Sequence, residues 1–152
     1  MLTHVHAADN VAVVATIDPD VTTASTVTSD WVDMSDFHTI LAVVLAGTLG
    51  TNATVDAKLE QATSAAGAGA KDISGTDITQ LTQAGTDQSD TQAVISLQSD
   101  ALDVDNGFQF VRLSITVGTA TSDAGGIILG VAPRVGPATD NDLASVGEVL
   151  RV

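Results

Sequence analysis

Hydrophobic and polar residues alternate along several stretches of the chain, which is the pattern of β-strands with one buried face. The longest such stretch is 107–119 (GFQFVRLSITVGT), in which every second residue from Val111 to Val117 is aliphatic. Residues 53–60 (ATVDAKLE) and 90–98 (DTQAVISLQ) alternate in the same way. These three segments predict strands that each bury one face in a core.

Three further segments are apolar with fewer interruptions, namely 10–17 (NVAVVATI), 38–45 (HTILAVVL) and 127–131 (IILGV). Each predicts a strand, and the near-continuous run in 38–45 predicts a central strand covered on both faces. Because a turn-forming stretch, 47–52 (GTLGTN), separates 38–45 from 53–60, the two strands are predicted to pair as a hairpin.

Turn signals rich in Asp, Gly and Pro separate the strands at residues 18–20, 103–107 and 122–126. Residues 21–29 suit an edge strand or a loop, and 140–152 suit a final strand or a short helix.

The longest interruption of the pattern covers residues 62–88. Small residues at 62–70 predict a loop. The sparse apolar anchors in 71–88 predict a long connection lying across a sheet edge, with a helical turn near 77–82 as an option. Together the elements predict a single-domain all-β fold, a β-sandwich or jelly-roll with a long cross-over loop. Residues 1–9 form an N-terminal arm and 10–152 the sandwich domain.

Composition refines this picture of the core. Hydrophobic residues make up 44% of the 152 residues but aromatic residues only 3%, so the core is built from small aliphatic side chains. Of the 19 acidic residues 17 are Asp, which favours turns and strand ends over helix surfaces.

The formal net charge of −14 excludes nucleic acid as a direct partner, because such a surface repels phosphate. The longest apolar run, Ile40–Ala46, is too short to cross a bilayer as a helix, so no membrane partner is expected. The first ten residues lack the basic and apolar regions of a secretion signal. The chain is therefore expected to be soluble and made in the cytoplasm of the producing cell.

No motif with catalytic chemistry stands out, so the chain is expected to be no enzyme and to hold no cofactor or metal. His4 and His6 share a strand face, but two imidazoles without a third ligand make a weak metal site. Residues 103–107 (DVDNG) begin like a calcium loop, but Ser114 stands where that loop needs Glu. A weak calcium site combining this turn with 140–142 (DND) stays an alternative.

Two regions are candidates for binding a partner protein. Trp31, the single tryptophan, lies among acidic residues, and tryptophan is enriched at interaction hot spots. Its alternative role is to plug one end of the sandwich. The polar arm is the second candidate, and its first six residues are Met1, Leu2, Thr3, His4, Val5 and His6.

Three motifs resemble those of virion structural proteins of tailed bacteriophages. They are ISGTDITQL at 73–81, GFQFVRLSITVG at 107–118 and APRVGPAT at 132–139, and the similar region runs from Asp33 to Thr139. The resemblance implies a small β-sandwich that acts as a head decoration, or cement, protein. Such a protein binds the outside of an icosahedral head, as homotrimers, with the major capsid protein as its partner.

This resemblance places the protein in the virion, on the outer surface of the phage head, after synthesis in the cytoplasm of a bacterial host. Two other functions stay open. The chain suits another virion part, such as a tail tube, neck or fibre component, or a carbohydrate-binding β-sandwich that recognises a host surface. The second alternative is disfavoured because sugar binding uses exposed aromatic rings, and the chain has no tyrosine.

Overall fold

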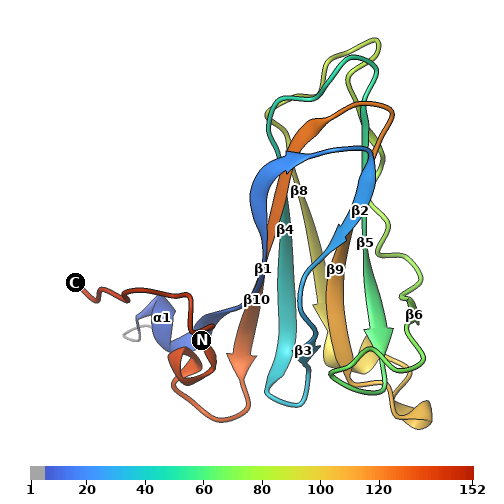
Figure 1. Cartoon of the computed structure of the whole chain (residues 1–152). Helices are drawn as coiled ribbons and strands as arrows, with labels where there is room; N and C mark the ends of the chain where they lie inside the picture. Colours follow the sequence, from blue (N-terminus) through green and yellow to red (C-terminus); the bar gives the residue numbers. More distant parts are fainter. Residues whose placement is uncertain (1–5) are drawn as a thin grey trace.

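Two antiparallel β-sheets pack face to face in the computed structural model, which describes residues 6–152 (Figure 1). Sheet A has the strand order β1 (Val11–Thr22), β10 (Ser122–Pro133), β4 (Phe37–Ala46) and β8 (Gln92–Gln98). Sheet B has the order β2 (Ser25–Thr28), β9 (Phe110–Gly118), β5 (Thr54–Ala62) and β6 (Lys71–Asp72). The prediction of an all-β sandwich is confirmed.

Short elements complete the fold. Strand β3 (Val32–Asp33) pairs with β9, and β7 (Leu81–Thr82) pairs with β5. The helical elements are α1 (Ala7–Asn10), η1 (Ser99–Ala101), η2 (Val104–Asn106) and η3 (Ala138–Asn141). Within residues 6–152 no helix is long and apolar enough to cross a membrane.

The strand pairs are nested along the sequence, which makes the sandwich a jelly roll. The outermost pair is β1 with β10 in sheet A, followed by β2 with β9 in sheet B. The next pair is β4 with β8 in sheet A, and the innermost is β5 with β6 and β7 in sheet B. The chain is thus one long antiparallel ribbon wrapped around its own core, the arrangement of a double-sheet jelly roll.

The core between the sheets is aliphatic, as the composition predicts. The largest fully buried side chains include Ile40, Leu59, Leu113, Ile115 and Ile128, which alternate with outward residues along their strands. A smaller cluster of Phe37, Ala12 and Ala138 lies beside it. Small residues let the sheets approach closely, and a Cβ added to Gly126 of β10 would lie 2.5 Å from Leu113 Cδ2 of β9.

The predicted hairpin between 38–45 and 53–60 is wrong, because these strands lie in opposite sheets. β4 pairs with β10 and β8, whereas β5 pairs with β9. Residues 47–53 instead carry the chain from sheet A to sheet B. The alternation of each strand requires one buried face, and both faces are buried when the two strands face each other across the core rather than side by side.

Two predicted turns are wrong as well, since residues 18–20 and 122–126 lie within strands. Pro19 occupies a register shift of edge strand β1, between Ile17 and Asp20. An edge strand tolerates proline at such a bulge because no ladder hydrogen bond is lost there. Opposite it, a Cβ on Gly125 would lie 2.7 Å from Pro19 Cα, so the glycine in β10 is required by this close approach and not by a turn.

The long connection after β5 covers an edge of sheet B, as predicted, but residues 77–82 form no helical turn. Ile73 and Ile78 donate backbone hydrogen bonds to Leu59 and Ala57 of β5. The buried Thr76 hydroxyl accepts from the Leu59 N–H and donates to the Ile73 carbonyl. The edge of β5 is therefore closed by the chain itself. Residues 140–152 form neither the expected strand nor an α-helix, since only the end of η3 is regular.

Close packing around Gly130 generates the first prediction. A Cβ at Gly130 of β10 would lie 2.5 Å from two ring carbons of Phe37, which is itself buried. We expect Gly130→Ala to lower the free energy of unfolding by about 1–3 kcal/mol because the ring has to move. In the double variant with Phe37→Leu the loss should be smaller than the sum of the two single losses.

Chemical unfolding measures these effects. Gly147→Ala is the control, because nothing lies within 4 Å of its added Cβ, and it should change the stability by less than about 0.5 kcal/mol. Additive losses in the double variant would contradict the contact.

Candidate functional site

The outer face of sheet A is an apolar surface that runs across all four strands. Its members alternate with core residues and are half-buried or exposed in this chain. The nine aliphatic side chains are Val11, Val13, Leu41, Val43, Leu45, Val94, Ile127, Leu129 and Val131. We call these residues the sheet A face.

Strand register makes the sheet A face continuous. One row across the sheet pairs Val13 with Leu129, and Leu129 with Leu41. The next row on this face pairs Ile127 with Val43, and Val43 with Val94. Adjacent rows on one face of a strand are two residues apart, so their side chains touch. The aliphatic positions therefore form a single patch and not scattered surface residues.

Charge distinguishes this patch from the rest of a strongly acidic protein. The remaining outward positions of the central part of sheet A are polar but uncharged, namely Thr16, Thr39, Gln92, Ser96 and Gln98. The outer face of sheet B carries charged side chains instead, namely Asp56, Lys58, Glu60 and Arg112. In a chain with a net charge of −14, these positions form an uncharged area of the outer surface, and Asp123 of β10, which pairs with Val21, lies beyond its Leu45 end.

The sheet A face corrects the prediction that 38–45 is covered on both faces. β4 is central in its sheet, but its outward side chains are not covered by this chain, and Leu45 is 42% exposed. Val94 on the neighbouring edge strand β8 is 59% exposed. Contiguous exposed apolar residues of this kind mark interaction surfaces.

Residues 6–10 and 138–152 form a terminal lobe beside sheet A. Figure 1 shows α1 and the C-terminal segment on the side of sheet A that faces away from sheet B. The lobe is tied to edge strand β1, because the Val13 N–H donates to Asp142 Oδ1 at 2.7 Å and the Leu143 N–H donates to the Val13 carbonyl at 2.8 Å. Arg151 pairs with Asp9 of α1 at 3.2 Å.

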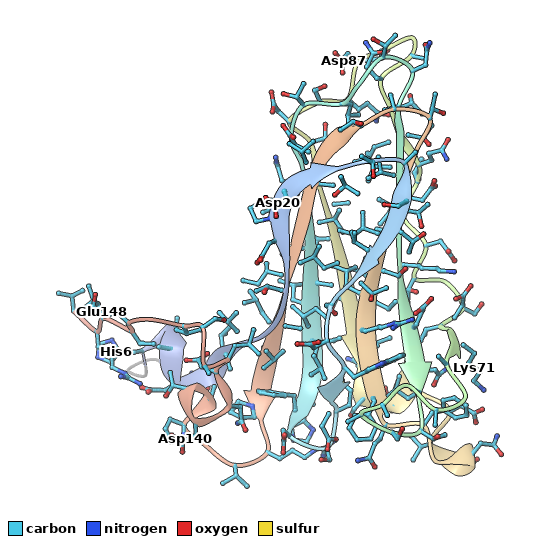
Figure 2. All side chains as sticks on the ribbon, in the orientation of Figure 1. His6, Asp20, Lys71, Asp87, Asp140 and Glu148 are labelled. Atoms are coloured by element: carbon cyan, nitrogen blue, oxygen red, sulfur yellow. The ribbon has the colours of Figure 1, made fainter. Side chains whose placement is uncertain are left out.

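The lobe ends in apolar residues that its own subunit does not bury. Leu150 is 75% exposed and Val149 is 37% exposed. Figure 2 shows His6, Asp140 and Glu148 on the lobe and Asp87 at the opposite end of the sandwich. The lobe therefore presents both charged and apolar groups away from the body of the domain.

Trp31, one predicted partner-binding residue, lies against the outer face of sheet B. Its ring is half-buried, and the Arg112 guanidinium carbon lies 4.5 Å from the ring centroid. A Cβ at Gly67 would lie 2.8 Å from Trp31 Nε1, so the 62–70 loop packs on the same ring. Arg112 Nε also donates to Glu60 Oε2 at 2.6 Å. A role of Trp31 in partner binding stays a prediction.

Lys71 of β6 links the connection after β5 to the 103–108 loop. Its ammonium lies 4.0 Å from the Phe108 ring centroid and donates a hydrogen bond to Asp103. Hydrogen bonds from Lys71 and Asn106 hold the pKa of the Asp103 carboxyl below its usual value. A lowered carboxyl pKa contributes stability at neutral pH that is lost as the pH falls through that lowered pKa.

The candidate metal ligands do not converge in the described part of the chain. His4 lies outside the described residues, together with Met1, Leu2, Thr3 and Val5, whereas His6 is exposed at the start of α1. No group of three or more His, Asp or Glu side chains suited to hold a metal occurs within residues 6–152. Asp103 is engaged by Lys71 and Asn106, and Asp142 accepts from the Val13 N–H, so the two acidic turns serve local structure.

Reasoning from the sequence missed the sheet A face as a site. The signal that could have revealed it is that residues 38–45 and 127–131 are apolar at both odd and even positions, so that both faces of each strand are apolar. Such runs are ambiguous, because a strand inside a larger core and a strand at a subunit interface have the same composition.

No family model and no curated protein matches the chain. A solved structure of infectious bursal disease virus, Gx strain, is similar with 12% identity and a TM-score of 0.44, over 85% of this chain. A structure of broad bean stain virus is similar with 14% identity and a TM-score of 0.39, over 75% of this chain. The similar region spans 34% and 62% of those chains, respectively. At these TM-scores neither likeness bears on what this chain does.

The Arg112 contacts generate the second prediction. Arg112→Ala should lower the free energy of unfolding by about 1–2 kcal/mol, because it removes a half-buried ion pair with Glu60 and the cation over Trp31. Since Trp31 is the single tryptophan, its fluorescence emission should shift to longer wavelength as the ring loses its cover. Chemical unfolding followed by fluorescence measures both effects.

Arg134→Ala is the matched control for this test. Its exposed guanidinium donates to Ser99 and lies in no ion pair within the described residues. It should cost less than about 0.5 kcal/mol and leave the emission unchanged. Equal losses in the two variants would contradict the role given to Arg112.

Proposed function

We propose that this protein is a structural subunit of a tailed-phage virion, a decoration or cement protein that binds the outer surface of the head and stabilises it. It acts by binding alone, with the major capsid protein and further copies of itself, as homotrimers, as its partners. It is not an enzyme in this proposal and holds no cofactor.

The observation that carries this proposal is the uncharged sheet A face on an otherwise strongly acidic jelly roll. A protein that stays monomeric gains nothing from nine aliphatic side chains on one outer sheet face, whereas an assembling subunit buries them. The resemblance of three motifs to those of tailed-phage virion proteins supports a role in the virion, and the head is the location that we propose. Many copies on one lattice make modest individual contacts sufficient.

The alternatives have less support. A carbohydrate-binding sandwich needs exposed aromatic rings, and Trp31 is already stacked under Arg112 of its own chain. A tail-tube subunit commonly contributes a long hairpin that pairs between subunits. Here the long 62–88 segment instead lies along β5 and is hydrogen-bonded to it.

Occupancy of heads that lack the protein is the third prediction. The purified chain should fill such heads to a fixed copy number and raise their resistance to heat, because it binds the assembled form preferentially. Leu45→Asp should lower the occupancy at a given concentration about tenfold, since it places a carboxylate in an apolar contact.

Sedimentation of the heads followed by quantitation of the bound chain measures occupancy. Val104→Asp is the control, an exposed apolar residue away from the sheet A face, and should fill heads like the unaltered chain. Density for the chain on tails or fibres of virions, with bare heads, would overturn the head assignment.

The N-terminal arm is the subject of the fourth prediction. We propose that Met1, Leu2, Thr3, His4, Val5 and His6 contact a neighbouring subunit in the assembled virion. Removing residues 1–6 should therefore reduce head occupancy several-fold, while α1 and the Asp9–Arg151 ion pair stay in place and the sandwich keeps its unfolding transition. Unchanged occupancy after this deletion would rule out the arm contact.

A further inference from the structure

We propose that the sheet A face binds the C-terminal segment 143–152 of a second copy of this chain. The inference rests on the proposed function in that it names the partner of the same surface. The contact joins two different surfaces of the subunit, the face of one copy and the lobe of the next.

Charge favours this occupant. Segment 143–152 (LASVGEVLRV) holds one acid, Glu148, and one base, Arg151, so its net charge is zero within a chain of net charge −14. The nine residues of the sheet A face are all aliphatic, and Asp123 of β10 is a charged outward residue beyond the Leu45 end of the patch. Both surfaces therefore escape the repulsion that acts between the other acidic surfaces of two copies.

Exposure of apolar groups points to the same pairing. Leu150 of the lobe is largely exposed and Val149 partly so, and on the face Val94 is largely exposed and Leu45 partly so. The sheet A face is broad and the segment is narrow. If the segment lies across the face, the apolar side chains of the segment and of the face are buried together.

The shape of the subunit keeps the segment from reaching its own face. Hydrogen bonds from Val13 to Asp142 and from Leu143 to Val13 fix the start of the segment at the outer edge of β1. From there the chain runs away from the sandwich, on the side opposite β5 and β6 (Figure 1). The segment is therefore held out where a neighbouring copy meets it.

The area of the sheet A face can be compared with the area that a stable interface buries. Four strands spaced about 4.8 Å apart and about seven residues long give a face of about 440 Å². A stable interface buries about 800 Å² on each partner. One contact through the face is therefore smaller than a standard interface, and in a closed ring each copy makes two such contacts, one through its face and one through its segment.

Such a contact is heterologous, and a heterologous contact closes into a ring when the rotation between copies divides a full turn. A ring of three copies matches the trimer of the proposed function. A face-to-face pair of copies related by a two-fold axis is the competing geometry, and it would leave the segment unused.

Engineered disulfides separate these geometries, because the chain has no cysteine of its own. Val94→Cys protein mixed with Leu150→Cys protein should form a disulfide between the two variants under mild oxidation. Neither variant alone should link to itself. Val94→Cys protein that links only to itself would establish the face-to-face pair and overturn the proposal.

Oligomer dissociation measured by sedimentation is the second readout, made on the full chain without heads. Val94→Asp and Leu150→Asp should each raise the dissociation constant at least about tenfold. The matched exposed controls, Val104→Asp and Val135→Asp, should stay within about twofold of the unaltered chain. An unaltered chain that is monomeric at about 0.1 mM, or an oligomer that withstands both test substitutions, would overturn the inference.

These outcomes are distinct from failure of the proposed function. A monomer that still fills heads would remove the contact between copies and leave the decoration role standing. An oligomer that forms through the lobe and binds no head would do the reverse.

Discussion

The close packing of Leu113 against Gly126 is the contact on which the fold depends. With 3% aromatic residues the chain cannot fill a wide space between two sheets. The sheets must approach each other closely, and β10, which lies between β1 and β4, permits this because it carries glycine where β9 presents a large side chain. Dense packing of small aliphatic groups then supplies the dispersion contacts that aromatic rings supply in other cores.

The two-layer architecture also determines which apolar side chains stay outside the core. β4 and β10 are aliphatic on both faces, but a two-layer sandwich covers only the face toward the other sheet. The outer face of sheet B is instead covered with charged side chains, which include the salt bridge between Arg112 and Glu60. Sheet A keeps an aliphatic outer face, which makes the domain asymmetric, since one outer surface is charged and the other is largely apolar.

The acidic residues lie outside the sheet A face. Many lie in the turns at the ends of the sandwich, on the outer face of sheet B and on the terminal lobe, as Asp87 and Asp140 illustrate (Figure 2), whereas Asp20 and Asp123 lie on β1 and β10 of sheet A beyond the aliphatic patch. Their mutual repulsion opposes random association of copies while leaving the sheet A face accessible. Charge thus limits the number of ways in which the chain can assemble, which is a means of specificity as much as of solubility.

The sequence by itself determined the all-β class, the aliphatic core and most strands, because period-2 alternation in 53–60, 90–98 and 107–119 reports local burial directly. Pairing was decided by the tertiary structure. The strands at 38–45 and 53–60 look like a hairpin, yet they face each other across the core, since alternation is the same for neighbours in a sheet and for partners across a sandwich.

The roles of glycine and proline also depended on the tertiary structure and could not be read from the local sequence. Gly125, Gly126 and Pro19 are typical of turns in sequence, but in the structure they allow close approach and a bulge inside strands. The apolar runs of β4 and β10 are another case. Composition shows that both faces of such a strand are apolar, and only the three-dimensional arrangement shows which face lies in the core and which lies on the outside of the sandwich.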